Sequence, residues 1–186
     1  DFCAGSGGLP GVINTPGGTF SFNPSPGDGS SIVSGTGAIS SATAGSTYNV
    51  QYLTPTGLCQ DSVTIAVNIV TSPTISNAGT AQNVCGTTAT LAGNVPTSGT
   101  GTWSLISGTG IIITSGSASS GITGLGIGAN VFEWSIANLP CSPSTSQVTI
   151  TGIAAPTVSA AGPPQSICGT TATLGGNVPT IGTGAW

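Results

Sequence analysis

Short runs in which apolar and polar residues alternate recur along the chain, and this period of two predicts β-strands. The clearest run is VFEWSI at residues 131–136, where Phe132, Trp134 and Ile136 would face a core while Glu133 faces water. The run NVQY at residues 49–52 has the same phase, with Val50 in an inward position. The pattern therefore predicts half-buried strands, each with one wet face.

Glycine-rich turns separate these runs, and they favour an all-β chain. Ser-Gly-Thr-Gly stands before an apolar strand at residues 34–37 and again at 107–110. Glycine adopts positive φ in such turns without steric cost. No amphipathic helix of ten residues can be drawn anywhere in the sequence. We therefore expect short strands joined by tight turns throughout.

The chain contains an internal repeat. Residues 73–103 and 156–186 align without gaps at an offset of 83, and 22 of these 31 positions are identical. Residues 1–70 form a more distant copy, which begins almost at its cysteine. We predict three modules: 1–70, which lacks its first strand; 71–154; and 155–186, the N-terminal part of a third. The short Pro-containing joints between them predict stiff head-to-tail stacking.

The five cysteines follow the same repeat. Cys3 and Cys59 are 56 residues apart, as are Cys85 and Cys141. This equal spacing predicts one disulfide inside each module, and hence an oxidising, extracellular setting. Cys168 is expected to be half of a third bridge, the alternative being a free reactive thiol. Short C-x₂₋₄-C pairs, which zinc sites use, are absent from the sequence.

An order of Cys, Trp, Cys within strand-rich modules is typical of an immunoglobulin-like sandwich. In residues 71–154 the separations are 18 and 38 residues. We expect about seven strands per module, with the disulfide joining the two sheets. Phe20, Trp103, Trp134 and Trp186 are the expected core aromatics, and the alternative for the three Trp residues is a platform that stacks on sugars.

Composition excludes several classes of function. The chain has no Lys, Arg or His, and only 2% of its residues are charged, for a net charge of −4. An ordinary soluble domain has about a quarter of its residues charged. Nucleic-acid binding and attraction to anionic lipid both need Lys or Arg. No apolar run is long enough to span a membrane.

The same composition argues against catalysis and predicts no cofactor. General acid–base chemistry needs His, Lys, a free thiol or a perturbed acid, and the four acids are scattered. Asp28, in Pro-Gly-Asp-Gly, is expected to be a turn residue; the alternative, a calcium ligand, lacks a second acid nearby. We expect no metal site.

The strings CGTTATLAGN, PTSGTGTWSLISGTG, GLGIGANVFEWSI and SQVTI, at residues 85–150, resemble a known repeat type. They are similar to the Ig-like or PKD-like repeats of very large surface adhesins of Bacteroidota, which occur in gliding-motility-associated proteins. The resemblance covers most of residues 73–186. It implies export by the type IX system to the bacterial cell surface or into an extracellular filament.

Residues 61–63, Asp-Ser-Val, resemble the O-glycosylation acceptor of the same bacteria, with Ser62 as the acceptor; the alternative is an exposed strand start. A surface with so little charge is expected to associate with neighbouring modules, with other copies or with glycans.

The function expected is therefore a structural and adhesive repeat segment. The alternatives are a carbohydrate-binding module and an accessory repeat of a secreted enzyme.

Overall fold

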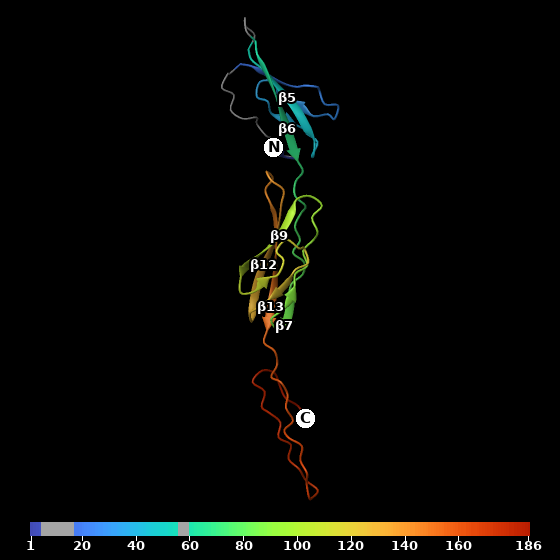
Figure 1. Ribbon diagram of the computed structural model, residues 1–186, viewed down its shortest axis with the longest axis vertical. Coiled ribbons are helices and arrows are strands. Elements are labelled where there is room, and N and C mark those ends of the chain that lie inside the picture. The colour runs from blue at the N-terminus through green and yellow to red at the C-terminus, as the bar shows by residue number, and fades with distance from the viewer. Residues whose placement is uncertain (5–16, 56–59) are drawn as a thin grey trace.

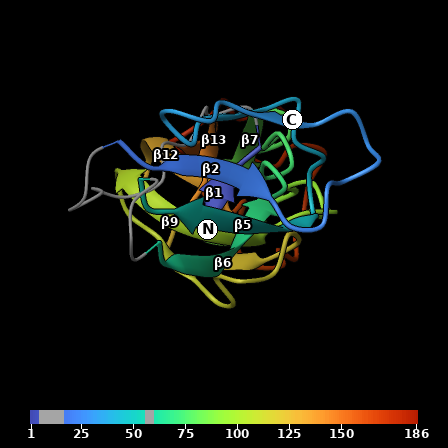
Figure 2. The ribbon, with the colours of Figure 1, turned by 90° about the horizontal axis from the view of Figure 1, so that it is seen from above.

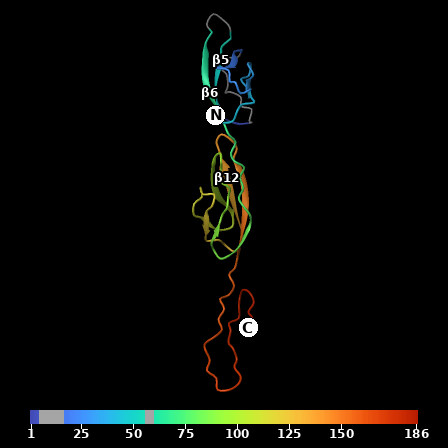
Figure 3. The same cartoon turned by 90° about the vertical axis from the view of Figure 1, so that its right-hand side faces the viewer.

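The computed structural model describes residues 1–4, 17–55 and 60–186. Strands are the only regular elements in these ranges, so the prediction of an all-β chain is confirmed. None of the described segments includes a helix that could span a bilayer. The modules follow one another along a single long axis, and two perpendicular side views agree on this (Figures 1 and 3). Viewed from above, they lie over one another (Figure 2).

The first module (residues 1–70) has six strands in its described part. They are β1 (Phe2–Cys3), β2 (Thr19–Phe22), β3 (Ser31–Ile32), β4 (Ile39–Ser40), β5 (Thr47–Leu53) and β6 (Ser62–Val70).

The second module (residues 71–154) has seven strands. They are β7 (Gln82–Cys85), β8 (Ala89–Thr90), β9 (Thr100–Ser107), β10 (Ile111–Ile112), β11 (Gly121–Thr123), β12 (Gly128–Ala137) and β13 (Ser144–Ile153).

Both modules share one strand arrangement. The main sheet of the first has the order β1-β6-β5-β2 and that of the second β7-β13-β12-β9, so corresponding strands take corresponding places. In each sheet one neighbouring pair is parallel, β1 with β6 in the first module and β7 with β13 in the second. The remaining pairs are antiparallel. A smaller sheet accompanies each main sheet, β3-β4 in the first module and β10-β11-β8 in the second. This is the layered pattern of a small β-sandwich.

The core of the second module lies against the inward face of β12. Phe132, Trp134 and Ile136 are completely buried, in the phase that the alternation predicts. Trp134 is paired with Trp103 across the β12–β9 ladder, and the two ring centroids are 5.0 Å apart at an interplanar angle of 37°. Such tilted aromatic pairs stabilise a core by more than their buried area alone accounts for. The Trp pair is therefore the centre of this core.

The first module has a smaller described core. It is formed by Phe20, Tyr48, Val50, Val67 and Ile69. On β6 only the half nearest the second module is buried, whereas Val63 and Ile65 are exposed.

Residues 155–186, here called the third segment, contain no assigned strand, although the structure describes all of them.

Candidate functional site

The joint between the first and second modules is where the chain brings reactive side chains together. Strand β1 runs parallel to the last two residues of β6, with Cys3 opposite Val70. The backbone N–H of Ala4 donates to the carbonyl of Val70 at 2.8 Å, which extends this pairing. Cys3 is therefore held at the end of the first module, next to the linker that leads into the second.

Cys141 reaches the same joint from the turn between β12 and β13. Its backbone N–H donates to the carbonyl of Asn138 at 2.9 Å, which closes the turn. The Asn138 side chain donates in turn to the carbonyl of Thr71 in the linker, at 2.8 Å. Cys141 is 2% exposed. Hydrogen bonds from the Asn138 side chain to Thr71 thus hold this turn against the linker.

A disulfide bonds Cys3 to Cys141, with 4.8 Å between their Cα atoms and a sequence separation of 138. The predicted pairing of Cys85 with Cys141 inside the second module is therefore wrong. Cys85 lies opposite Ile153 at the far end of β13, whereas Cys141 precedes its first residue. A ten-residue strand separates the two by about 30 Å, and a disulfide needs Cα atoms within about 7 Å. The bridge joins two modules instead of closing one.

The other cysteines do not take part in this bridge. Cys85 and Cys168 are exposed free thiols, so the expected disulfide of Cys85 is not formed. Cys59, and with it the predicted Cys3–Cys59 bridge, falls on a residue outside the described ranges; the bond of Cys3 to Cys141 excludes that pairing here.

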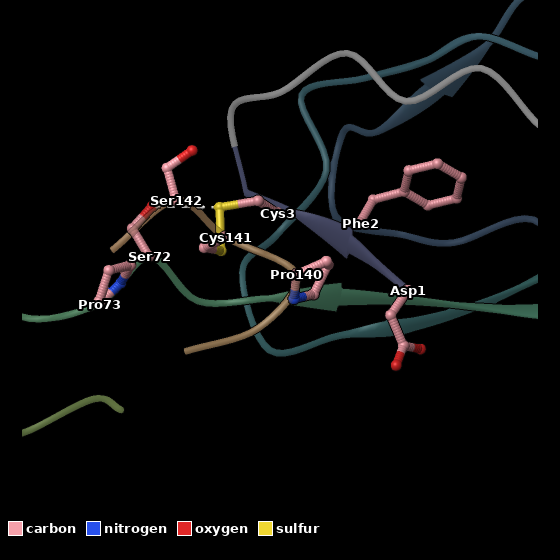
Figure 4. A pocket seen from close by; sticks show the side chains of 8 residues that line it. All are labelled: Asp1, Phe2, Cys3, Ser72, Pro73, Pro140, Cys141 and Ser142. Carbon is pink, nitrogen blue, oxygen red and sulfur yellow. Dashed lines mark hydrogen bonds between the residues drawn. A yellow bond between two sulfur atoms is a disulfide. The ribbon is translucent and has the colours of Figure 1, made fainter. Parts of the chain in front are cut away.

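A hollow of about 550 Å³ opens beside the bridge, lined by Asp1, Phe2, Cys3, Ser72, Pro73, Pro140, Cys141 and Ser142. Figure 4 shows the two sulfur atoms between the linker and the β12–β13 turn, with the Phe2 ring turned away from them. Phe2 packs against the core of the first module. The only acid in the lining is Asp1, which accepts a hydrogen bond from the Asn68 amide at 2.8 Å. The lining thus holds a covalent connection between two modules and a single acidic side chain.

Asp28 lies in a second polar cluster, on the first module. Its carboxylate accepts hydrogen bonds from the Ser30 hydroxyl (2.6 Å), the Ser30 N–H (3.0 Å), the Thr43 hydroxyl (2.9 Å) and the Tyr48 hydroxyl. The bonds from Ser30 and Tyr48 lower the pKa of Asp28 far below its usual range. No group of three or more metal-ligating side chains occurs in the described residues. Asp28 is thus a structural acceptor that fastens a loop to β5.

Three of the four predicted core aromatics are buried, and the fourth is exposed. Phe20, Trp103 and Trp134 are buried. Their placement leaves none of these three rings available to a sugar. Trp186 was expected in a core, but it is 78% exposed. Its repeat counterpart Trp103 is covered by β12, and residues 155–186 supply no counterpart of that strand.

Ser62, the predicted glycan acceptor, is exposed at the first position of β6. Its backbone N–H donates to the carboxylate of Asp61 at 2.8 Å.

Sequence reasoning missed the role of the β12–β13 turn. Asn138 and Pro140 sit in it, and nothing in the strand pattern marks them. The sequence carries no signal for this role, because only the strand pairing, with Cys3 opposite Val70 and Cys85 opposite Ile153, places each of these cysteines at the end of its module.

Comparison with protein-family models gives no match. No curated protein matches either. Among solved structures, the chain is similar to extracellular domains 3–5 of Drosophila OTK, with a TM-score of 0.51 and 14% identity. That match covers 74% of this chain, and the chain spans about half, 51%, of the OTK structure.

Two further solved structures are weaker matches. The PKD domain from the KIAA 1837 protein gives a TM-score of 0.38 and 20% identity over 49% of this chain and 92% of that one. A variant of titin domains I67–I69 gives a TM-score of 0.45 and 11% identity, over 83% of this chain and 62% of that one. At these identities the likenesses concern the fold alone, and the sheets themselves show an all-β, Ig-like sandwich.

Proposed function

We propose that this chain is a structural and adhesive segment of a large surface protein, in which Ig-like modules stack into a stiff rod. The observation that carries the proposal is the Cys3–Cys141 bridge, because it fastens one module to the next across their joint. A hinge needs a joint that can open, and this joint is crossed by a linker, a disulfide and the Asn138–Thr71 hydrogen bond. The covalent link would resist bending as well as pulling.

Surface composition supports association of such rods. With 2% charged residues, little charge opposes contact between copies. Large apolar side chains are strongly exposed on the second module; the most exposed are Ile75, Leu139, Ile127, Val95, Ile111 and Ile113. The partners we propose are therefore neighbouring repeats or further copies of this chain, packed laterally as a fibre, and glycans on exposed hydroxyls such as Ser62.

A disulfide is typical of proteins in an oxidising compartment, so the Cys3–Cys141 bridge supports an extracellular setting. Together with the resemblance of its repeats to those of Bacteroidota adhesins, this supports a position on the bacterial cell surface or in an extracellular filament. Export by the type IX system, and a part in gliding motility, belong to the same proposal. The buried state of Trp103 and Trp134 favours this function over carbohydrate binding, because sugar stacking needs exposed rings.

Electron micrographs of the purified protein test the proposal. We expect straight rods of uniform length under oxidising conditions, and lateral bundles at high concentration. The Cys3→Ser/Cys141→Ser variant, purified in the same way, should give bent particles. Particles that bend freely at the joint in the oxidised protein would contradict the rod. Monomers that never bundle but bind on a glycan array would point to the carbohydrate-binding alternative.

A further inference from the structure

The two cysteines of the inter-module bridge have different surroundings. Cys141 is 2% exposed, whereas Cys3 is half-buried. Cys141 Sγ lies 3.5 Å from the carbonyl oxygen of Thr71 and 3.8 Å from that of Val70. Cys3 Sγ lies 3.8 Å from the hydroxyl oxygen of Ser72. One cysteine is therefore enclosed by the backbone of the joint, and the other reaches the surface.

The accessibility of Cys3 follows from the direction of β1. This strand is parallel to β6, and Cys3 lies opposite Val70, the last residue of β6. Asp1 accepts a hydrogen bond from the Asn68 amide, further back along the same strand. The chain before Cys3 therefore runs along β6 into the first module, away from the joint, and leaves the bridge uncovered.

Cys141 is enclosed because its turn is docked on the linker. The Asn138 amide donates to the Thr71 carbonyl at 2.8 Å and to the Ser98 hydroxyl at 3.2 Å. These hydrogen bonds do not involve sulfur, so they can hold the turn in place when the bridge is open. An opened bridge would therefore keep Cys141 beside the linker.

The two surroundings favour opposite directions of thiol–disulfide exchange. An incoming thiolate bonds to one sulfur of a disulfide, and the other sulfur leaves as a thiolate. The leaving group favours attack at Cys141, because the Ser72 hydroxyl would donate to a Cys3 thiolate, whereas carbonyl oxygens would repel a Cys141 thiolate. This preference is small, since the Ser72 contact is long. Access favours attack at Cys3 and decides the direction, because a 2% exposed residue offers no path to an incoming sulfur atom.

We propose that Cys3 is a thiol-addition site, at which a small thiol opens the inter-module bridge and from which Cys141 later expels it. In the opening step the thiolate sulfur of the small thiol bonds to Cys3 Sγ. The Cys3–Cys141 bond breaks, and Cys141 leaves with the bonding electron pair and takes a proton from water. In the closing step the Cys141 thiolate attacks Cys3 Sγ, and the small thiol leaves. The number of disulfide bonds is the same before and after each step, so neither step needs an oxidant.

The position of the adduct tests the opening step. The experiment uses the full chain with Cys59→Ser, Cys85→Ser and Cys168→Ser, so that thiols outside the bridge cannot exchange. The chain is incubated briefly with reduced glutathione, quenched with N-ethylmaleimide and digested with pepsin at low pH, and the labels are located by mass spectrometry.

We expect glutathione on Cys3 and maleimide on Cys141, in at least about tenfold excess over the reverse arrangement, because access controls which sulfur is attacked. Equal amounts, or an excess of glutathione on Cys141, would overturn the proposal. So would a folded chain that forms no adduct although the unfolded chain does.

Unfolding removes the cause of the preference. In guanidinium chloride both sulfur atoms are open to solvent, so adducts on the two cysteines should approach equal amounts. Loss of the bridge should also become at least about tenfold faster, because neither sulfur is shielded. A preference for Cys3 that persists in denaturant would show that the neighbouring sequence sets it, and would overturn the role given to burial.

Asn138 is a positioning residue in this scheme, and its removal should change where the thiol adds. In Asn138→Ala the turn loses its hydrogen bonds to the linker, and the share of adduct on Cys141 should rise by at least about threefold. Asn83→Ala, at an exposed position on β7, is the matched control and should leave the share unchanged. The fluorescence emission of the buried Trp pair checks that the module stays folded. Equal shares in the two folded variants would overturn the shielding of Cys141 by its turn.

Release of the adduct tests the closing step. The chain with glutathione on Cys3 is separated from excess thiol by gel filtration and kept at neutral pH. Cys141 should then release one equivalent of glutathione and restore the bridge. Asn138→Ala should slow this release by at least about threefold, because the docked turn raises the effective concentration of the Cys141 thiol. An adduct that stays on the folded chain would overturn the role of Cys141.

This inference goes beyond the proposed function, because it concerns which sulfur of the bridge reacts. Micrographs decide whether the modules form a rod, and the positions of the labels decide whether Cys3 is the thiol-addition site. Bent particles with glutathione on Cys3 would remove the rod alone, and straight rods with glutathione on Cys141 would remove the thiol-addition site alone.

Discussion

Gly101 lies beneath the indole of Trp134, so closely that a methyl carbon at Gly101 would be 2.1 Å from Trp134 Cζ2. The second residue of β9 must therefore be a glycine for reasons of space, since the Trp103–Trp134 pair occupies the volume beside it. Neither ring can move easily: Trp134 Nε1 donates to the Asn94 carbonyl at 3.1 Å and Trp103 Nε1 to the Ala118 carbonyl at 3.2 Å.

Gly101→Ala should therefore destabilise the second module. Overpacking of a filled core costs about 1–3 kcal/mol. The measurement is the free energy of unfolding from denaturant titration, followed by tryptophan fluorescence. Gly116→Ala is the matched control, because a methyl there meets nothing within 4 Å. If both variants unfold at the same denaturant concentration, the indole does not occupy this place in solution.

A buried amide, Asn130 at 2% exposure, connects two loops of the second module to β13. Its oxygen accepts from the N–H of Thr109 at 2.7 Å, and its nitrogen donates to the carbonyls of Gly126, Gly128 and Ile150 at 2.9–3.2 Å. Asn130→Ala would leave these backbone groups without their partner. We expect a loss of about 3 kcal/mol in the free energy of unfolding.

The control for Asn130 is Asn83→Ala, at an exposed position on β7, which should change the free energy of unfolding little. Equal losses in both variants would show that the buried amide has no special role. Hydrogen exchange adds a local readout: the amide of Thr109 should lose protection in Asn130→Ala.

Asp28 makes the first module sensitive to acid. Hydrogen bonds from Ser30 and Tyr48 lower its pKa in the folded chain, so the unfolded chain binds the proton more readily. The stabilisation is present at neutral pH and is lost progressively as the pH falls below about 4, the usual range of an Asp carboxyl. Asp28→Asn lacks it at every pH.

The difference in melting temperature between Asp28→Asn and the unchanged chain should therefore be largest at neutral pH and shrink on acidification. Asp61→Asn, which alters an exposed acid that accepts a hydrogen bond from Ser62, serves as the control and should not reproduce this trend. A difference that stays constant between neutral and strongly acidic pH would contradict the role given to Asp28.

Much of the architecture could be predicted from local pattern. The alternation in residues 131–136 identified the buried face of β12, because side chains of a strand point to opposite faces in turn. The repeat identified Trp103 and Trp186 as equivalents. It could not show that Trp186 is exposed, because burial depends on what the rest of the module supplies.

The cysteine pairing could not be derived from spacing. The cysteines recur with the repeat, so a bridge inside each module and a bridge from each module to the next would both recur at regular intervals. Cys85–Cys141 and Cys3–Cys141 therefore fit the spacing equally well. Strand direction decides between them: β7 is parallel to β13 and pairs with its last residues, which places Cys85 at one end of the module and Cys141 at the other. That relationship is a property of the sheet and leaves no mark on the local sequence.

The bridge has a mechanical consequence that can be measured. When the chain is pulled from its ends, force passes from Cys3 to Cys141 through sulfur, and the residues between them, over a sequence separation of 138, are bypassed. At 3.3–3.6 Å per residue they would add about 480 Å to the extended length. Single-molecule stretching should show this extra length only after reduction or in the Cys3→Ser/Cys141→Ser variant. Cys168→Ser, which alters a free thiol, should extend like the unchanged chain. An oxidised chain that extends fully would show that the joint is not bridged, and the rod would lose the contact that stiffens it.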